Sequence, residues 1–350
     1  MLKPILIGIS PNTESDDVWL ALKLWFQPWR WRVGHGLDRL TAAIKKYFPG
    51  RQCYLVNSGR TALYLGIKSL NLQPGDEVLH LEFTCAVVPE AIRRAGAVPV
   101  AVKDWHRPKI TVKTKALIVQ HTFGLPDNLT KIAALCRRHH LVLIEDCAHS
   151  LGARYRGRPI GSFGDLAVLS FGRDKVISSV FGGALLAKKR LSLPSLAFPG
   201  RGWIAKQLFH PVLMSLAVPT YFWLGKYLIF LARKLNLITL PLESLPAQAL
   251  PNALAILSLN QWDKLDRLNR HRRRLARFYA QKLQQPFDEQ GIYLRYPLAV
   301  TRPPAVLAAA KTKGLLLGNW YDNRIINLPT HIKMNLDDAR RIIQFIKADV

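Results

Sequence analysis

The stretch from Leu141 to Gly183 constrains the fold more than any other part of the chain. It opens with an apolar run, Leu141 to Ile144, which is the pattern of a strand buried in a parallel sheet. Two acids, Glu145 and Asp146, follow directly. Because open α/β sheets bind their ligands at the carboxyl ends of their strands, an acid at this position predicts a ligand site.

A lysine and a serine follow the next strand of the same stretch. Leu166 to Phe171 is a second apolar run with Ser170 near its end, and Lys175 comes five residues later on a loop. An aspartate and a lysine at neighbouring strand ends are what pyridoxal phosphate chemistry needs. Asp146 would keep the pyridine nitrogen protonated, Lys175 would form the Schiff base, and Ser170 would hydrogen-bond the phosphate.

Strand and helix patterns alternate before this stretch. Such alternation predicts a mostly parallel sheet. Between the first strand and its helix, Ser58-Gly59-Arg60 forms a tight turn, where backbone N–H groups at a helix N-terminus bind phosphate and Gly59 permits close approach. The expected strands are Tyr54–Val56, Val78–Leu81, Val98–Val102 and Ala116–Gln120, and the expected helices are Leu37–Tyr47 and Leu129–His140.

The motifs EDCAHSLGA and GSFGDLAVLSF, with the lysine five residues after the serine, resemble the DegT/DnrJ/EryC1/StrS family. Its members are sugar aminotransferases of the fold-type-I pyridoxal phosphate class. The resemblance runs from about Gly34 to the C-terminus. It implies a homodimer whose subunit has a three-layer α/β large domain with a mostly parallel sheet and a smaller C-terminal α/β domain. We expect an N-terminal arm over residues 1–33, the large domain over 34–250 with an apolar insert at 208–232, and the small domain over 251–350.

The resemblance also suggests which residues form the site. It implies that Lys175 and Asp146 are catalytic and that His149 lies near the phenolic oxygen of the cofactor. Cys85 stands where the family stacks an aromatic residue on the cofactor ring. The residues expected to bind pyridoxal 5'-phosphate are therefore Ser58, Gly59, Arg60, Cys85, Asp146, His149, Ser170 and Lys175.

Several positions depart from the family pattern. Arg60 replaces a threonine, and Phe181 replaces the acid of a Gly-Glu-Gly-Gly run. Ala247 and Ala249 lie near the positions of an asparagine and an arginine that help bind the cofactor phosphate across the dimer. Cys85 is the fourth departure, and Arg60 is a candidate replacement for the lost phosphate contact.

Composition narrows the class of protein. The four cysteines form no CxxC pair, which suits a reducing cytoplasm and predicts no metal site. No cleavable signal peptide is expected, because Pro11, Asp16 and Asp17 follow a short apolar run. The net charge of +27 implies an anionic partner, either phospholipid or a nucleotide diphosphate. No nucleic-acid-binding signature accompanies this charge, so nucleic acid is not expected.

Two segments raise the question of a membrane. The arm interleaves Trp19, Trp25, Phe26, Trp29 and Trp31 with arginine, which is typical of a membrane–water interface or of an arm that packs its aromatic residues on the body or on a partner subunit. The insert Leu208–Ala232 has Lys226 as its only charge, and Pro211 and Pro219 interrupt it. Because the chain must return to the same globule, we expect a hairpin or re-entrant segment at an anionic membrane surface rather than a crossing; the alternative is a buried pair of helices in a dimer.

A strongly basic helix is expected from Ala253 to Leu283. Its apolar residues recur at helical spacing, and its arginines form either a solvated face or one that meets lipid phosphates. These arginines are Arg267, Arg270, Arg272, Arg273, Arg274 and Arg277. In the last segment, Asn335 is expected to cap a helix over Leu336–Ile346.

The sequence thus predicts amino transfer from an amino acid to a keto-sugar, nucleotide-activated, in cell-surface polysaccharide or amino-sugar biosynthesis. We expect the protein in the cytoplasm, peripheral and monotopic on the inner face of the membrane. One alternative is a membrane-associated scaffold or regulator that keeps the fold without turnover. Another is a sugar dehydratase, a branch that typically has histidine in place of the lysine found here at Lys175.

Overall fold

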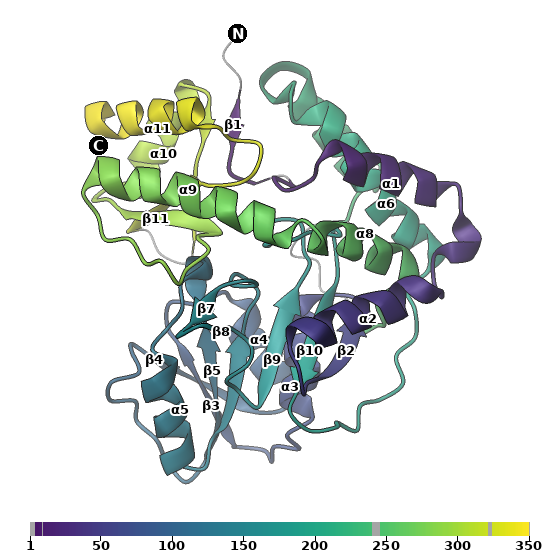
Figure 1. Ribbon diagram of the computed structural model, residues 1–350, viewed down its shortest axis with the longest axis vertical. Helices are drawn as coiled ribbons and strands as arrows, with labels where there is room; N and C mark the ends of the chain where they lie inside the picture. Colours follow the sequence, from purple (N-terminus) through teal and green to yellow (C-terminus); the bar gives the residue numbers. More distant parts are fainter. Residues whose placement is uncertain (1–3, 9, 240–245, 321–323, 350) are drawn as a thin grey trace.

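A seven-stranded mixed sheet forms the centre of the molecule (Figure 1). A computed structural model describes residues 4–8, 10–239, 246–320 and 324–349. The order across the sheet is β2-β10-β9-β6-β5-β3-β4, and β10 alone of these strands runs antiparallel to its neighbours. The strands are β2 (Gln52–Val56), β3 (Glu77–Leu81), β4 (Val98–Val102), β5 (Thr114–Gln120), β6 (Val142–Asp146), β9 (Leu166–Ser170) and β10 (Gly183–Ala187).

Helices cover both faces of this sheet, which gives the three layers. Side chains alternate between the faces: Leu143 packs with the core under α2 and α5, whereas Ile144 packs with the core under α3 and α4. The expected fold, an α/β large domain with a mostly parallel sheet, is confirmed. The covering helices are α2 (His35–Tyr47), α3 (Gly59–Lys68), α4 (Val87–Arg94) and α5 (Leu129–Arg138); a short 3-10 turn, η2 (Thr122–Gly124), and the strand pair β7 (Arg154–Tyr155) and β8 (Arg158–Pro159) complete this half.

The C-terminal part builds a second, smaller sheet in the order β11-β14-β13. Asn335 caps its last helix, accepting a hydrogen bond from the Asp338 N–H at 2.8 Å. The N-terminal strand β1 returns to this part and pairs in parallel with β12. The elements are β1 (Ile5–Leu6), β11 (Arg295–Ala299), α10 (Pro303–Thr312), β12 (Leu315–Leu316), β13 (Gly318–Asn319), β14 (Ile325–Pro329) and α11 (Leu336–Asp349).

Two helices replace the single helix expected over Ala253–Leu283. They are α8 (Asn252–Trp262), which packs against α2, and α9 (Leu265–Leu283). The chain breaks at Lys264, whose ammonium group binds Asp16 at 2.6 Å and Asp17 at 3.0 Å in the arm. The expectation of one continuous helix was therefore wrong.

The arginines of α9 do not share one exposed face. Arg272 is buried and donates hydrogen bonds to the side chains of Asn269 and Asn12, so its assignment to a solvated or lipid-facing surface was wrong. Arg267 pairs with Glu14 of the arm. A long arginine side chain on a helix can turn into the protein where hydrogen-bond acceptors from other segments lie nearby. A run of charges in the sequence does not show which arginines do so.

The insert forms a bent pair of helices that projects from the end of the molecule away from the sheet (Figure 1). It comprises α6 (Arg201–Ala217), a π-helical turn η3 (Tyr221–Gly225) and α7 (Lys226–Lys234), bent by 120°. Gly225 makes the bend possible, since a Cβ there would lie 1.8 Å from the carbonyl oxygen of Ala217. Within the described residues no single helix has the length and apolarity to span a membrane, although this bent pair passes that test of length and composition as a unit.

The N-terminal arm packs along this insert. It contains α1 (Ser15–Trp25), which lies against α6, and a 3-10 turn η1 (Pro28–Arg30). Trp25 contacts Phe209 of α6, with ring centroids 5.8 Å apart, and Trp31 is buried. Trp19, Phe26 and Trp29 remain about 70% exposed. The arm therefore does both things the sequence allowed: it packs some of its aromatic residues on the body and presents others outward.

Candidate active site

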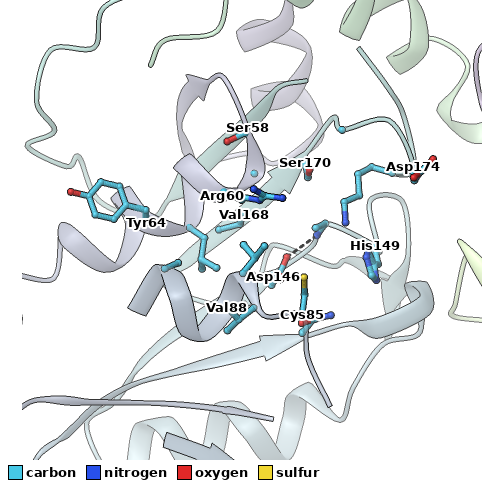
Figure 2. Close-up of a pocket in the computed structure, with 18 of the residues that line it drawn as sticks. Ser58, Arg60, Tyr64, Cys85, Val88, Asp146, His149, Val168, Ser170 and Asp174 are labelled. Carbon is cyan, nitrogen blue, oxygen red and sulfur yellow. Dashed lines mark hydrogen bonds between the residues drawn. The ribbon is translucent and has the colours of Figure 1, made fainter. Parts of the chain in front are cut away.

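The eight residues expected at the site surround one cavity of about 400 Å³ (Figure 2). The cavity lies at the carboxyl edge of the sheet because β2, β6 and β9 point the same way and end there. Figure 2 shows Ser58, Arg60 and Ser170 on one side and Asp146, His149 and Cys85 on the other. The lining residues foreseen from sequence are Ser58, Gly59, Arg60, Cys85, Asp146, His149, Ser170 and Lys175.

The structure separates the roles of the two adjacent acids. The carboxylate of Glu145 accepts backbone hydrogen bonds from Gly161 at 2.8 Å, Phe163 at 2.7 Å and Gly164 at 2.6 Å. Burial acts to raise the pKa of Glu145, but His121 and these N–H groups outweigh it and hold that pKa below its usual range. Glu145 thus anchors the loop that contains Gly161, Phe163 and Gly164. Both of its carboxylate oxygens are occupied by these hydrogen bonds, so the side chain does not serve as a ligand-binding group.

Asp146 is the acid that lines the cavity. Its Oδ1 accepts a hydrogen bond from the backbone N–H of Ala148 at 3.0 Å. Burial raises the pKa of Asp146 above its ordinary value, while the Ala148 N–H and the charge of Lys175 act in the opposite direction. A buried carboxylate with few donors is stabilised by a cationic partner, so this position suits the protonated ring nitrogen of a bound pyridine.

Lys175 lines the same cavity and is held by its backbone. The side-chain amide of Asn12 donates to the carbonyl oxygen of Lys175 at 2.5 Å, and the buried Arg272 donates to the next carbonyl, that of Val176, at 2.6 Å. Arg272 also binds the Asn12 Oδ1 at 2.9 Å. Burial lowers the pKa of Lys175, against the opposing charge of Asp146. The backbone of the lysine loop is therefore fixed in place, and the buried amine loses its proton more readily than a solvated lysine does.

The opposite side of the cavity is built for an anion. Ser58 caps α3, its Oγ accepting from the Thr61 N–H at 3.1 Å, and the first N–H groups of this helix point towards the cavity edge. A Cβ at Gly59 would lie 2.7 Å from the Cβ of Ser170, so only glycine lets this turn approach the end of β9. Arg60 lines the cavity beside them and adds positive charge.

Aromatic rings form a third wall. His149 stacks on Trp320 with centroids 4.6 Å apart, and Trp320 stacks in turn on Phe123 at 5.7 Å. The guanidinium of Arg295 lies 4.2 Å from the Trp320 ring centroid. Burial lowers the pKa of His149 well below 6.5, so this histidine is neutral at physiological pH. Trp320 lines the cavity, and its neighbour Tyr321 lies outside the described residues.

Three of the departures from the family pattern, Arg60, Cys85 and Phe181, line this cavity, whereas Ala247 and Ala249 do not. Val180 adopts a φ of +71°, a conformation that β-branched residues rarely adopt, and Gly182 follows at +146°. Phe181 lines the cavity and contacts Trp203 of α6 edge to face, with centroids 5.4 Å apart. Ala249 forms a bridge with Val56 at the end of β2. The end of β2, which leads into the Ser58–Arg60 turn, is thus joined to the segment around Ala249 that follows the insert.

Sequence reasoning missed several residues in and around this site, among them Gln120, Asn12 and Arg272. Gln120 ends β5 in register with Asp146 and lines the cavity, accepting a hydrogen bond from Thr84. Its place at a strand end was a usable signal. No signal in the sequence pointed to Asn12 and Arg272, because their contact joins segments that lie 260 residues apart.

The cavity fits pyridoxal phosphate, the cofactor expected from the sequence. Three groups occupy different walls of the cavity. They are the buried carboxylate of Asp146, the amine of Lys175 with its pKa lowered by burial, and the start of α3 at Gly59. These groups are complementary in chemistry to the ring nitrogen, the aldehyde and the phosphate of the cofactor, in that order. Asp146, Lys175 and the Ser58–Arg60 turn with Ser170 would hold it.

Comparisons with known proteins agree with this reading. The DegT/DnrJ/EryC1/StrS aminotransferase family matches residues 21–191. A GDP-perosamine synthase of Escherichia coli O157:H7 is 34% identical over 214 residues, which are 58% of this chain and 56% of that protein. A UDP-N-acetyl-3-dehydro-alpha-D-glucosamine 3-aminotransferase of Acidithiobacillus ferrooxidans is 36% identical over 163 residues, 44% of this chain and 43% of that protein. The chain matches about half the length of its first curated relatives.

Solved structures extend the likeness of fold to the whole chain. PseC of Helicobacter pylori, an aminotransferase involved in the biosynthesis of pseudoaminic acid, has a TM-score of 0.76 at 16% identity and covers 99% of this chain, with 98% of its own chain covered. At this identity the likeness concerns the fold alone. The motifs, the cavity and the family match together place residues 21–191 of this chain in the DegT/DnrJ/EryC1/StrS aminotransferase family.

Proposed function

We propose that this protein is a pyridoxal phosphate-dependent aminotransferase that moves an amino group from an amino acid to a nucleotide-activated keto-sugar. One observation carries the proposal: Asp146 and Lys175 share a cavity with the phosphate-side turn Ser58–Arg60. Family membership and relatives named as transaminases of nucleotide sugars support it. The class of product fits cell-surface polysaccharide or amino-sugar biosynthesis.

The chain's own residues divide the work. When bound, the cofactor supplies an electron sink for carbon–nitrogen chemistry. Asp146 orients it and holds its ring nitrogen protonated. The Lys175 amine, with its pKa lowered by burial, moves a proton at the substrate carbon. The neutral His149 and Trp320 exclude water from that wall, and the Ser58–Arg60 turn holds the phosphate.

The first test is chemical trapping, which does not depend on turnover. Purified protein incubated with pyridoxal phosphate and then borohydride should gain the mass of the reduced cofactor on the peptide that contains Lys175. Lys175→Ala should gain none, and Lys188→Ala, on an exposed lysine beyond the site, serves as the matched control. Wild-type protein that takes up no cofactor contradicts the proposal.

The scaffold alternative rests on Phe181 and Cys85, which line the cavity in place of the family's acid and aromatic residue. The two functions differ in one measurement. If trapping shows that the cofactor binds at Lys175, an aminotransferase must also, in a separate sample without borohydride, convert its bound cofactor to the amine form when L-glutamate or L-glutamine is added, with a shift of the absorbance band. Cofactor binding without this shift for any of the twenty amino acids favours the scaffold. The dehydratase alternative is disfavoured by Lys175 itself.

We further propose that the enzyme is a homodimer, as the family resemblance implies. The cavity opens beside α3 and α4, where Arg60, Tyr64 and Arg94 line it. In a homodimer the second subunit would cover that side, and since it also has alanine at 247 and 249, Arg60 is the candidate to replace the lost phosphate contact. Light scattering should give twice the mass of one 39.6 kDa chain. A monomer at micromolar concentration contradicts this proposal.

We propose, finally, that the bent pair α6–α7 holds the protein at the inner face of a membrane. Its outward residues include Leu216, Trp223, Tyr227, Phe230 and Leu231, each at least half exposed. No acidic residue lies between Asp174 and Glu243. An apolar surface and surrounding positive charge are the two signals that stable peripheral binding needs.

Vesicle sedimentation tests the proposal of membrane binding. The protein should sediment with phosphatidylglycerol vesicles, and high salt should release only part of it, because salt screens charge but leaves the apolar contact. Phe230→Glu with Leu231→Glu, both on the exposed side of α7, should abolish the residual binding. Arg340→Gln with Lys347→Gln, at exposed positions of α11, lowers the net charge by the same two units and is the charge-matched control. Protein that stays in solution at low salt contradicts it.

A further inference from the structure

An open groove of about 480 Å³ lies on the exposed side of α9, next to the first residue of α11. It shares no lining residue with the active-site cavity, and the functions proposed above make no use of it. Its size is within the range of sites that bind small organic molecules. Four arginines line it together with apolar side chains: Arg270, Arg273, Arg274, Arg277, Phe278 and Leu336.

The four arginines lie on one face of the helix. They occupy positions i, i+3, i+4 and i+7 counted from Arg270, and residues at these spacings are neighbours on a helix surface. Like charges at such spacings repel each other and destabilise a helix. The sequence of α9 therefore places four positive charges where they weaken the helix unless anions bind them.

Three of these four arginines have no partner within the described part of the chain. Arg277 binds both carboxylate oxygens of Glu289 at 2.7 Å. The side chains of Arg270, Arg273 and Arg274 form neither an ion pair nor a hydrogen bond with any described residue. The remaining arginines of α9 differ, because they bind residues of the N-terminal arm. Three guanidinium groups are therefore available to a ligand.

Two acids near the groove in the sequence do not neutralise these charges. Asp266, one helical turn before Arg270, forms no ion pair with it. Asp337, which follows Leu336 at the start of α11, pairs with Arg340. The groove thus has an excess of positive charge, which a multivalent anion would compensate.

The chemistry of the groove indicates a phosphate ligand that also has an organic part. Guanidinium groups bind phosphate oxygens through paired hydrogen bonds, and three of them suit a group with more than one phosphate. Phe278 and Leu336, both half-buried, present apolar surface beside the arginines. We propose that the groove binds an organic diphosphate, with its phosphates at the three unpaired arginines and its organic part against Phe278 and Leu336.

Isothermal titration calorimetry of the intact protein at constant ionic strength tests this proposal. The ligands are uridine diphosphate, farnesyl diphosphate below its critical micelle concentration, and pyrophosphate. We expect at least one of the two organic diphosphates to bind at least tenfold more tightly than pyrophosphate. The tighter of the two distinguishes a nucleotide from a prenyl lipid as the source of the ligand. No turnover is needed, so the result does not depend on the proposed aminotransferase activity.

The double variant Arg270→Gln with Arg274→Gln should weaken this binding at least tenfold. Arg137→Gln with Arg138→Gln, at two exposed positions at the end of α5, lowers the net charge equally and should leave the binding unchanged. A nucleotide in the active-site cavity would be unaffected by either double variant, so only binding lost in the first is assigned to the groove. Without ligand, the first variant should unfold at an equal or higher urea concentration than the wild type, because two repelling charges are removed.

Three outcomes would overturn the proposal. Equal affinity for pyrophosphate would show a site for small anions without an organic part. Unchanged binding in the variant Arg270→Gln with Arg274→Gln would place the ligand elsewhere on the protein. If neither organic diphosphate binds, the groove is not such a site, and a loss of affinity for phosphatidylglycerol vesicles in the same variant would then assign these arginines to a membrane-facing surface.

Discussion

Asn12 holds the reactive lysine although it lies far from the cavity in sequence. Its amide donates to the carbonyl oxygen of Lys175 at 2.5 Å and its Oδ1 accepts from Arg272. Asn12→Ala leaves both groups without this partner, which costs about 1–3 kcal/mol for buried polar groups. We expect slower cofactor capture and at least a tenfold lower kcat with an unchanged KM for the sugar.

Absorbance separates positioning from simple loss of stability. With cofactor bound, the pH midpoint of the visible band reports the surroundings of the Lys175 nitrogen, and it should move in Asn12→Ala. The control is Asn260→Ala, whose amide binds Asp16 and Asp17 on the same arm without touching the lysine loop. An equal shift of the midpoint in both variants would mean that the arm acts only through stability.

Asp146 gives the second prediction at this scale. Asp146→Asn should bind pyridoxal phosphate, because the phosphate-side turn is intact, yet lose about 10²-fold or more in kcat, since a neutral amide cannot hold the ring nitrogen protonated. The measurement is cofactor occupancy by absorbance beside steady-state rates. Near-normal turnover would show that a different acid does this work.

The sequence could nominate both acids after β6 but could not choose between them by pattern alone. Glu145 and Asp146 point to opposite sides of one strand, so their environments depend on what packs on each side. Glu145 meets three backbone N–H groups supplied by a loop that follows it by more than fifteen residues. The family motif made the choice of Asp146; the physical reason becomes visible only in three dimensions.

At the scale of elements, Gly225 determines the shape of the insert. A Cβ there would lie 1.8 Å from the Ala217 carbonyl oxygen, so Gly225→Ala must push α7 away from α6. We expect a loss of about 1–3 kcal/mol, typical of overpacking, and faster proteolysis within the bend. Gly202→Ala is the matched control, since no atom lies within 4 Å of its Cβ. That variant should be neutral or more stable, by up to about 1 kcal/mol.

The central strands β5, β6 and β9 were predictable because most of their side chains are buried on both faces, and uninterrupted apolar runs mark such strands well. The break between α8 and α9 was not, because no glycine or proline marks it. Lys264 turns there to reach the acids of the arm at Asp16 and Asp17. The bend at Pro219 was visible in sequence, whereas the tight return at Gly225 depends on its contact with Ala217.

For the whole molecule, buried histidines set the dependence of stability on pH. Burial lowers the pKa of His149 and His210 well below 6.5 and that of His331 to about 3. Below pH 6.5 the unfolded chain therefore binds protons that the native protein does not, and the free energy of unfolding falls as pH falls. Each histidine contributes about 1.4 kcal/mol per pH unit in that window. The pKa values of His80 and His271 are also lowered by burial and add to the decline, whereas Asp146, with its raised pKa, acts in the opposite direction.

Urea unfolding at pH 7.5, 6.0 and 5.0 measures this dependence. The midpoint should be constant above pH 7 and then decline. In His331→Gln, which retains a donor for the Leu6 carbonyl, the free energy of unfolding should decline less steeply as pH falls. The difference should be the contribution of one histidine, about 1.4 kcal/mol per pH unit. A midpoint that rises on acidification would contradict the assignment of neutral, buried histidines.

The arrangement of the two sheets followed from the family resemblance, but the path of the N-terminus did not. The pairing of β1 with β12 joins Ile5 to Leu315. Two-residue strands carry no periodic signal, and nothing local to either segment specifies the other. The same is true of Ser10, whose hydroxyl lies 2.8 Å from Nε2 of His210 in the insert.

Asn12 and Arg272 together form a clamp on the backbone around Lys175, and this clamp has a consequence for the order of events during synthesis. Asn12 leaves the ribosome early, Lys175 follows much later, and Arg272 later still, yet all three must be present before the lysine loop is fixed. A nascent chain that ends before α9 has the strands of the sheet but no clamp. Cofactor capture should therefore begin only after α9 has emerged, so a chain halted between β10 and α9 would not yet compete for pyridoxal phosphate in the cell.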